Sequence, residues 1–196
     1  FESLYYPGEA IFALAQLHIE DGDERWLSAS ERAASYLITV RDRDVPDDKL
    51  EHDHWLLMGL EQLQAKRPKD LYLQHGVRIG DAIVRAMQQG PYLDWDGSFY
   101  DPPRSTPAST RVEGLVALVR MLERAGRPAE KYRAALARIV SFQKSCQITE
   151  ENSLFLPNPA PLWGGFRESL TSYDVRIDFV QHAISGMLGY RGLLGG

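Results

Sequence analysis

Residues 174–187 of the chain read DVRIDFVQHAISGM, and this stretch decides the fold. Asp174, Asp178 and His182 follow one another at intervals of four residues, so a helix would place all three along one face. Apolar or small residues then continue at helical spacing as far as Met187. The stretch therefore predicts a helix whose first turn lies at a polar site and whose remainder lies in a core.

The same pattern occurs three more times, in residues 5–17 (YYPGEAIFALAQL), 52–63 (HDHWLLMGLEQL) and 110–122 (TRVEGLVALVRML). In every copy a small residue comes four positions after a residue at the polar start, and a large apolar residue follows it. Counted from Glu9, Trp55, Glu113 and His182, these pairs are Ala13-Leu14, Gly59-Leu60, Ala117-Leu118 and Gly186-Met187. One helix type used four times is typical of a repeat architecture.

These four polar-headed helices alternate with plainly amphipathic ones, which we expect over residues 24–39, 71–89 and 128–146. Runs of alternating β-branched residues are almost absent, so the predicted class is all-α. Short connections make neighbouring helices antiparallel, and the four polar-headed helices would then share one direction. Their N-termini would gather at one end, here called the mouth, which two long loops also reach. In the first of these loops we expect a short hairpin around Gly97 and Phe99.

Composition narrows the class of protein. A chain of 196 residues with 44% hydrophobic content is long enough for one domain, residues 1–196, with its own core. The net charge of −5 argues against a nucleic-acid partner, and no apolar run approaches the roughly 20 residues of a membrane span. Cys146 has no second cysteine to pair with, and its helical context predicts an inert buried thiol. No signal-peptide pattern is visible in the sequence, which begins directly in a core-type helix, so we expect it to be cut from a longer protein or processed.

With the motifs YYPGEA, HDHW, TRVEG and RIDFVQH, the chain resembles the six-hairpin (α/α)-toroid superfamily. That group includes glycoside hydrolases, unsaturated uronyl hydrolases, N-acylglucosamine-epimerase-like enzymes and some polysaccharide lyases. The resemblance implies parallel inner helices, outer helices that run back, and a saccharide bound at the mouth. Four inner helices instead of six imply a partial or open barrel. We expect the chain to be the C-terminal part of a longer toroid. Self-association or a missing N-terminal segment would then complete the ring and cover its apolar flank. The fold alone does not choose among these activities.

Four carboxyl groups stand near the starts of the polar-headed helices. Glycoside hydrolysis needs two carboxyl groups about 5 to 9.5 Å apart, one as acid and one as nucleophile or base. Glu9, Asp53, Glu113 and Asp178 are the candidates, and we predict a glycoside hydrolase that pairs Asp53 with Glu113 or Asp178. The alternative is helix capping, since an acidic first turn stabilises a helix by about 0.3–1 kcal/mol without any catalysis.

Arginines and aromatic residues accompany these carboxyl groups. Arg111 and Arg176 each stand two residues before a carboxylate, and residues two apart do not face each other on a helix. We therefore expect no local ion pair, but either a bidentate clamp on a substrate carboxylate or a tie to a neighbouring helix. Trp55 and Trp163 are predicted to stack on sugar rings, or alternatively to pin the long loops.

Histidines supply a second enzymatic hypothesis. His182 is predicted to act as a general acid or base oriented by Asp178, and a sugar epimerase or isomerase would use it together with His54. The alternative is a hydrogen-bonded core histidine. A possible metal set consists of His52, Asp53 and His54 with His182 and Glu9, but it matches no recognised metal motif, so we predict neither metal nor cofactor. Phosphate-loop, dinucleotide and serine-hydrolase motifs are absent from the sequence as well. A third hypothesis is a non-catalytic helical domain that binds glycan or protein at the mouth.

Overall fold

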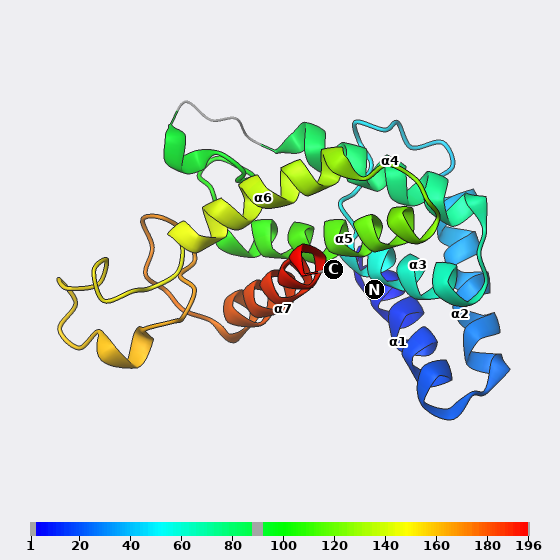
Figure 1. The fold of residues 1–196 in the computed structure, drawn as a ribbon, viewed down its shortest axis with the longest axis horizontal. Helices are drawn as coiled ribbons and strands as arrows, with labels where there is room; N and C mark the ends of the chain where they lie inside the picture. Colours follow the sequence, from blue (N-terminus) through cyan, green and yellow to red (C-terminus); the bar gives the residue numbers. More distant parts are fainter. Residues whose placement is uncertain (1–2, 88–91, 196) are drawn as a thin grey trace. The chain divides into compact units, whose positions relative to one another are not determined.

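The computed structural model describes residues 3–87 and 92–195, and over these residues it contains seven α-helices and no β-strand (Figure 1). The all-α prediction is confirmed. The helices are α1 (Tyr6–Asp21), α2 (Glu24–Tyr36), α3 (His54–Lys66), α4 (Asp70–Ala86), α5 (Ser105–Arg124), α6 (Glu130–Ser145) and α7 (Ile177–Leu194). A π-helical turn (Leu37–Arg41) continues α2, and single 3-10 turns occupy Leu93–Trp95 and Ala160–Leu162. The end predicted for the fourth helix, Gln89, lies outside the described residues.

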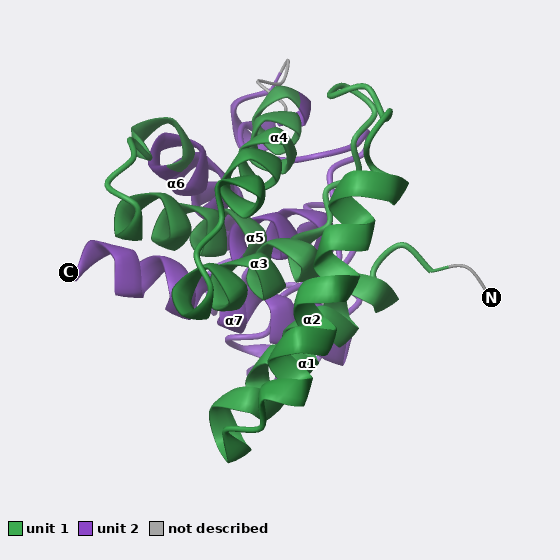
Figure 2. Cartoon of the chain, turned by 90° about the vertical axis from the view of Figure 1, so that its right-hand side faces the viewer, with its two compact units in different colours: residues 1–85, 114–132 green, residues 86–113, 133–196 purple. Residues whose placement is uncertain are grey.

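The chain divides into two compact units, coloured separately in Figure 2. Unit 1 comprises residues 1–85 and 114–132, and unit 2 comprises residues 86–113 and 133–196. The units meet inside α4 (85/86), α5 (113/114) and α6 (132/133), so both units contain part of each of these helices. A single domain over residues 1–196 stays a prediction, and each unit is described by itself below.

In unit 1 the first helices begin and end at residues with a clear local preference. Pro7 stands in the first turn of α1, where its missing N–H is not needed. Gly22 ends α1 with a φ of 74°, and its N–H donates to the carbonyl of His18. The Asp23 side chain then accepts a hydrogen bond from the Arg25 N–H and caps α2.

The helices of unit 1 pack as hairpins with a defined direction. Ser30 of α2 donates to the carbonyl of Ile11 at 2.8 Å, and the start of α2 lies by the end of α1, so these helices are antiparallel. A Cβ atom on Gly8 would lie 2.6 Å from Leu56 N, and one on Gly59 would lie 2.7 Å from Ile11 Cγ2. Residues 8 and 11 thus match residues 56 and 59 in the same order, which makes α1 and α3 parallel.

Glycines also let α4 approach α5 within unit 1. Gly76 faces Met121 and Gly80 faces Leu118, so the two helices run in opposite directions. The buried core of the unit is largely aliphatic, and its fully buried members include Ile11, Leu56, Leu57, Leu60, Leu63, Ile79, Ile83, Leu115 and Leu118. Burying each such side chain stabilises the fold by roughly 1.5–3 kcal/mol.

The charged connection between the π-turn and α3 is fastened to α4. Arg78 donates to the carbonyls of Asp42 at 3.3 Å and Val45 at 2.8 Å, and Arg85 donates to the carbonyl of Asp47 at 2.6 Å. The sequence of this connection predicts a solvated loop, and residues 43, 44 and 46–49 are indeed exposed, while its backbone is held by guanidinium groups.

In unit 2 a small apolar cluster of Phe166, Phe179 and Ala183 joins α7 to the loop that precedes it. The hairpin expected around Gly97 and Phe99 is wrong. Gly97 has a φ of 81° in a turn closed by the Ser98 N–H and the Trp95 carbonyl at 2.9 Å. It also lies directly against the backbone of α6, so there is no room for strand pairing on that side.

The expected beginning of the seventh helix is also wrong. The helix begins at Ile177, and the segment before it is extended because Val175 bridges to Arg167 and the Asp174 carbonyl accepts the Glu168 N–H at 2.9 Å. Asp174 therefore does not share a helix face with Asp178.

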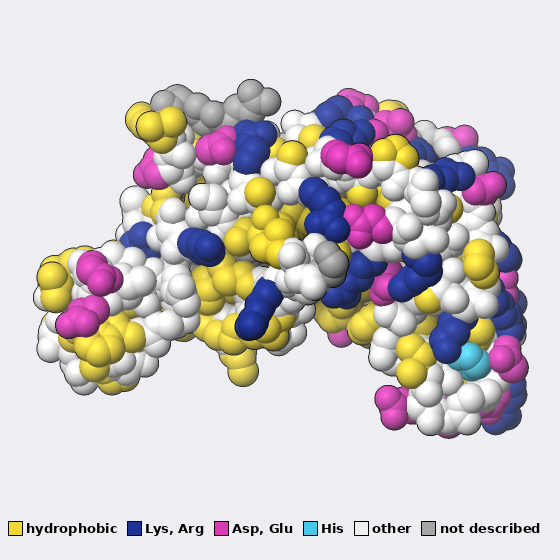
Figure 3. Space-filling model, in the orientation of Figure 1, with side chains coloured by type: hydrophobic (Ala, Val, Ile, Leu, Met, Phe, Trp, Pro, Cys, Tyr) yellow, Lys and Arg dark blue, Asp and Glu magenta, His cyan; other side chains and the backbone are white. Residues whose placement is uncertain are grey.

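Apolar side chains are exposed along α7. Ile177, Ile184 and Leu188, at helical spacing, are exposed, and Figure 3 shows apolar side chains gathered where this helix lies in Figure 1. Over the described part of the chain, none of the helices has both the length and the apolar character needed to cross a membrane.

Candidate functional site

The closest meeting of predicted site residues is between Glu113 and His182 in unit 2. Oε2 of Glu113 on α5 lies 2.8 Å from Nδ1 of His182 on α7. Helix α7 comes close to α5 here because Gly186, one turn after the histidine, has no side chain: a Cβ atom on it would lie 3.1 Å from Val112 Cγ1. Glu113 is buried, whereas the His182 side chain keeps 15% of its surface exposed. The pair thus joins a shielded carboxylate to an imidazole that solvent can reach.

The charges around His182 favour its protonated form. The hydrogen bond to Glu113 raises the pKa of His182 above its ordinary value, burial opposes this, and the charge of Asp178 adds to the rise. The imidazolium donates its Nδ1–H to the carboxylate, and its second N–H is at Nε2. We expected Asp178 to orient the His182 ring, but the hydrogen-bond partner of His182 is Glu113 on another helix.

Asp178 forms a local ion pair with Arg176, contrary to our expectation. Nε of Arg176 lies 3.0 Å from Oδ1 of Asp178. The rule that residues two apart face different ways holds within a helix, but Arg176 precedes α7 with extended backbone angles (φ −126°, ψ 157°). Its guanidinium also lies over the Phe179 ring, 5.1 Å from the centroid.

Arg111 is buried and connects the first half of α5 to the loop before it. Its guanidinium lies over the rings of Phe99 and Tyr100, at 4.7 and 5.4 Å from their centroids. It also donates to the Pro107 carbonyl at 2.8 Å and to the Tyr100 hydroxyl at 3.1 Å. The contacts with Phe99 and Tyr100 fix the loop on α5, and the expected tie to a neighbouring helix stays a prediction. A role as a substrate clamp stays a prediction.

Trp163 belongs to an aromatic loop of unit 2. Its ring is 46% exposed and its Nε1–H donates to the Ser153 hydroxyl at 3.2 Å. Phe155, which is also exposed, meets Tyr173 edge to face with 5.1 Å between the centroids. Exposed ring faces of this kind suit both predicted roles, sugar stacking and loop anchoring.

Asp53, in unit 1, caps α3 from a fully buried position. Its Oδ1 accepts the Leu56 N–H at 3.0 Å, and its Oδ2 lies 3.4 Å from Nη1 of Arg41. Burial raises the pKa of Asp53 to about 6, while the Leu56 N–H and the Arg41 charge oppose the rise. The capping alternative therefore describes its contacts, and its catalytic role stays a prediction.

Arg41 makes its shorter hydrogen bonds to another carboxylate, that of Asp42. Two bonds of 2.6 and 2.8 Å join this pair, and Asp42 also lies 3.1 Å from Nε2 of His75. Burial acts to raise the pKa of Asp42, but the bonds to Arg41 and His75 outweigh it and lower the pKa to about 2. This network was missed from the sequence, where only the adjacency of Arg41 and Asp42 hints at it.

The remaining predicted residues of unit 1 lie in the first turns of α1 and α3. His54 is buried with its ring edge to face with Tyr5 (5.4 Å between centroids), and Trp55 is half-buried beside Phe12. Glu9 is exposed. Because α1 and α3 are parallel, these side chains belong to one end of the helix pair.

Comparisons of the chain with protein-family models, with curated proteins and with solved structures give no match in any of the three. Function is therefore inferred from the side chains themselves. Glu113 and His182 are residue types that bind metals and could supply two ligands to an ion. The expectation of no metal and no cofactor stays a prediction.

Proposed function

We propose that the protein is a carbohydrate-active enzyme in which His182, held by Glu113, transfers protons at a saccharide. The observation that carries this proposal is the 2.8 Å contact between the Glu113 carboxylate and Nδ1 of His182. A carboxylate on one imidazole nitrogen orients the ring and makes the other nitrogen an effective proton carrier. Tyr100, Phe155 and Trp163 support a saccharide substrate, because unit 2 exposes these rings to solvent.

Glycoside hydrolysis is the reaction we propose first. Asp178 stands one turn before His182 on α7 and influences its charge, so unit 2 supplies a second carboxyl group close to the histidine. In this scheme Glu113 and Asp178 act as the carboxyl pair, and the contact with His182 holds the Glu113 carboxylate in position. Arg176, paired with Asp178, would position a substrate acid group.

Epimerisation or isomerisation of a sugar is the second candidate. The raised pKa of His182 favours it, because the protonated form of the imidazole is stabilised and this form can deliver a proton to a carbon or oxygen of the sugar. His54 was predicted as the partner base, and that assignment stays a prediction.

For the fold we propose a toroid-like array of helical hairpins. The antiparallel hairpin of α1 and α2 and the parallel direction of α1 and α3 support it, because inner helices of such arrays share a direction. Completion of a ring, by a second copy or by a preceding segment, stays a prediction.

A product assay tests the proposed function. The full chain is incubated with neutral and uronic-acid-containing oligosaccharides, and products are measured by chromatography with mass detection. We expect turnover that falls at least about 100-fold in Glu113→Gln and His182→Gln, the range of one general acid or base. His18→Gln, in α1 of unit 1, is the matched histidine control and should keep full turnover.

Incubation in deuterated water separates the two reactions, because epimerisation at carbon incorporates deuterium without bond cleavage. Binding of oligosaccharides without any product would refute the enzyme and favour the glycan-binding alternative. Turnover that survives in both site variants would refute the assignment of the site.

A further inference from the structure

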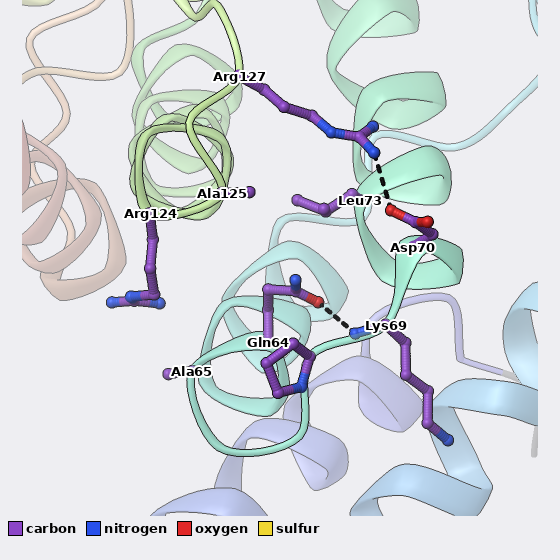
Figure 4. Close-up of a pocket in the computed structure, with 9 residues that line it drawn as sticks. Gln64, Ala65, Lys69, Asp70, Leu73, Arg124, Ala125 and Arg127 are labelled. Atoms are coloured by element: carbon purple, nitrogen blue, oxygen red, sulfur yellow. Dashed lines mark hydrogen bonds and ion pairs between the residues drawn. The ribbon is translucent and has the colours of Figure 1, made fainter.

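Unit 1 contains a pocket of about 440 Å³ between the end of α3, the start of α4 and the end of α5 (Figure 4). It lies by Gln64 and Ala65, in the last turn of α3, whereas Asp53 and His54 stand at the start of that helix. A helix of 13 residues is about 20 Å long, so the two ends are well separated. No predicted site residue lines this pocket.

Gln64 turns hydrogen-bond donors into the pocket. Its residue surface is only 6% exposed, and its Oε1 accepts the Lys69 N–H at 2.9 Å, which fixes the orientation of the amide. The Nε2 group consequently points toward the interior of the pocket (Figure 4). Within residues 3–87 and 92–195 no group accepts a hydrogen bond from it. A ligand acceptor would satisfy this nearly buried amide.

Two arginines from the end of α5 border the same space. Arg124 donates one bond to Glu61 at 3.2 Å, and Arg127 donates one bond to Asp70 at 2.8 Å. A guanidinium has five N–H donors, so a single bond leaves most of them available. Both side chains are more than 40% exposed (46% and 43%), so a ligand can reach them.

The charges of the lining favour an anion. Lys69, Arg124 and Arg127 carry positive charge, with the Lys69 ammonium paired to Glu31 outside the lining, and Asp70 is the one acidic residue among the described lining residues. The N-terminus of α4, which begins at Asp70, adds partial positive charge on the same side. Leu73 supplies an apolar wall. The volume corresponds to about 15 water molecules at about 30 Å³ each, which is more than a bare oxyanion fills.

We propose that this pocket binds a small organic anion, whose phosphate or carboxylate group is held by Gln64, Arg124 and Arg127. The planar guanidinium groups match the oxygens of either group, and the amide of Gln64 adds a neutral donor from the pocket floor. The apolar wall at Leu73 receives the organic part of the ligand.

Nuclear magnetic resonance titration of the full chain tests the proposal, with inorganic phosphate, acetate, a hexose phosphate and a hexuronate as probes at constant ionic strength. We expect saturable shifts of the Gln64 side-chain amide with at least one probe, and none with sodium chloride. The preferred probe distinguishes phosphate from carboxylate. Absence of saturable shifts with all four probes would overturn the proposal.

Single substitutions test which side chains contact the bound anion. Arg124→Gln and Arg127→Gln should each weaken binding about tenfold, the usual effect of losing one charge-assisted hydrogen bond. Asp70→Asn should strengthen it, because the carboxylate that competes for Arg127 is removed. Arg120→Gln is the matched control, since Arg120 is exposed one turn earlier on α5 and does not line the pocket. Equal weakening in the control would overturn the proposal, because it would indicate only a general charge effect. The outcome does not depend on the catalytic site, whose residues belong to unit 2.

Discussion

Replacing Asp53 by asparagine should change how the stability of the protein depends on pH. The carboxyl group is fully buried, and its Oδ1 caps α3 through the Leu56 N–H. Asparagine caps a helix about as well as aspartate does, so Asp53→Asn keeps this bond and removes only the titrating charge. Arg41 keeps its two stronger bonds to Asp42 in the variant.

The magnitude follows from the raised pKa of Asp53. Burial moves the pKa from an ordinary value of 3.8 to about 6, so the folded state binds the proton more tightly than the unfolded state does. The stabilisation by this proton is fully present below pH 3.8 and is lost as the pH rises through about 6. At about 1.36 kcal/mol per pH unit, the wild type should lose about 3 kcal/mol relative to Asp53→Asn between these limits.

Urea unfolding followed by circular dichroism measures this difference. The free energies of unfolding of both proteins are compared at several pH values between 4 and 8 at constant salt, so that other titrating groups cancel. A constant difference would show that Asp53 does not titrate in this range. A wild type that gains stability relative to the variant as the pH rises would show that the Arg41 ion pair outweighs burial, and would refute the reasoning.

Three further predictions concern Gly97, Cys146 and Glu113 of unit 2. Gly97→Ala should cost about 2 kcal/mol more in unfolding free energy than Gly126→Ala, because both glycines have positive φ (81° and 66°) but only the first lies against another backbone. Equal losses in thermal or urea unfolding would contradict this. Burial raises the pKa of Cys146 to about 12, so the native thiol should resist a thiol reagent at pH 8 and react only after unfolding. Rapid labelling of the native protein would show that it is accessible. Glu113→Gln should lower the pKa of His182 toward 6.5, measured by nuclear magnetic resonance titration, whereas an unchanged pKa would mean that the carboxylate does not hold the imidazolium.

Features that depend on near neighbours in the chain could be predicted from the sequence. The spacing of apolar residues predicted all seven helices, and the small residue expected four positions after each polar start explains two close approaches. Gly59 admits Ile11, and Gly186 admits Val112. The buried state predicted for Cys146 is confirmed. These features could be read because periodicity and side-chain size act within a turn or two.

Partners that are distant in the chain could not be predicted. Glu113 and His182 are 69 positions apart, and Asp42 and His75 are 33 positions apart, so no local pattern joins either pair. The misplaced start of α7 has the same origin. The helical spacing of its carboxylates is real, but Asp174 is drawn into backbone pairing with the preceding loop, and this tertiary contact overrides local propensity.

The connection between the π-turn and α3 is held through its backbone, and this determines how freely the sequence of the connection can vary. Arg78 and Arg85 hold that connection by three carbonyl oxygens, to which the Asp47 carboxylate adds one bond from Arg78 at 2.8 Å, and every amino acid supplies a carbonyl. Exchanging the charged side chains between Asp44 and Asp48 would therefore leave the carbonyl acceptors intact. Substitution of either arginine on α4 would release them, so the shape of the segment is encoded more than 30 positions downstream of it.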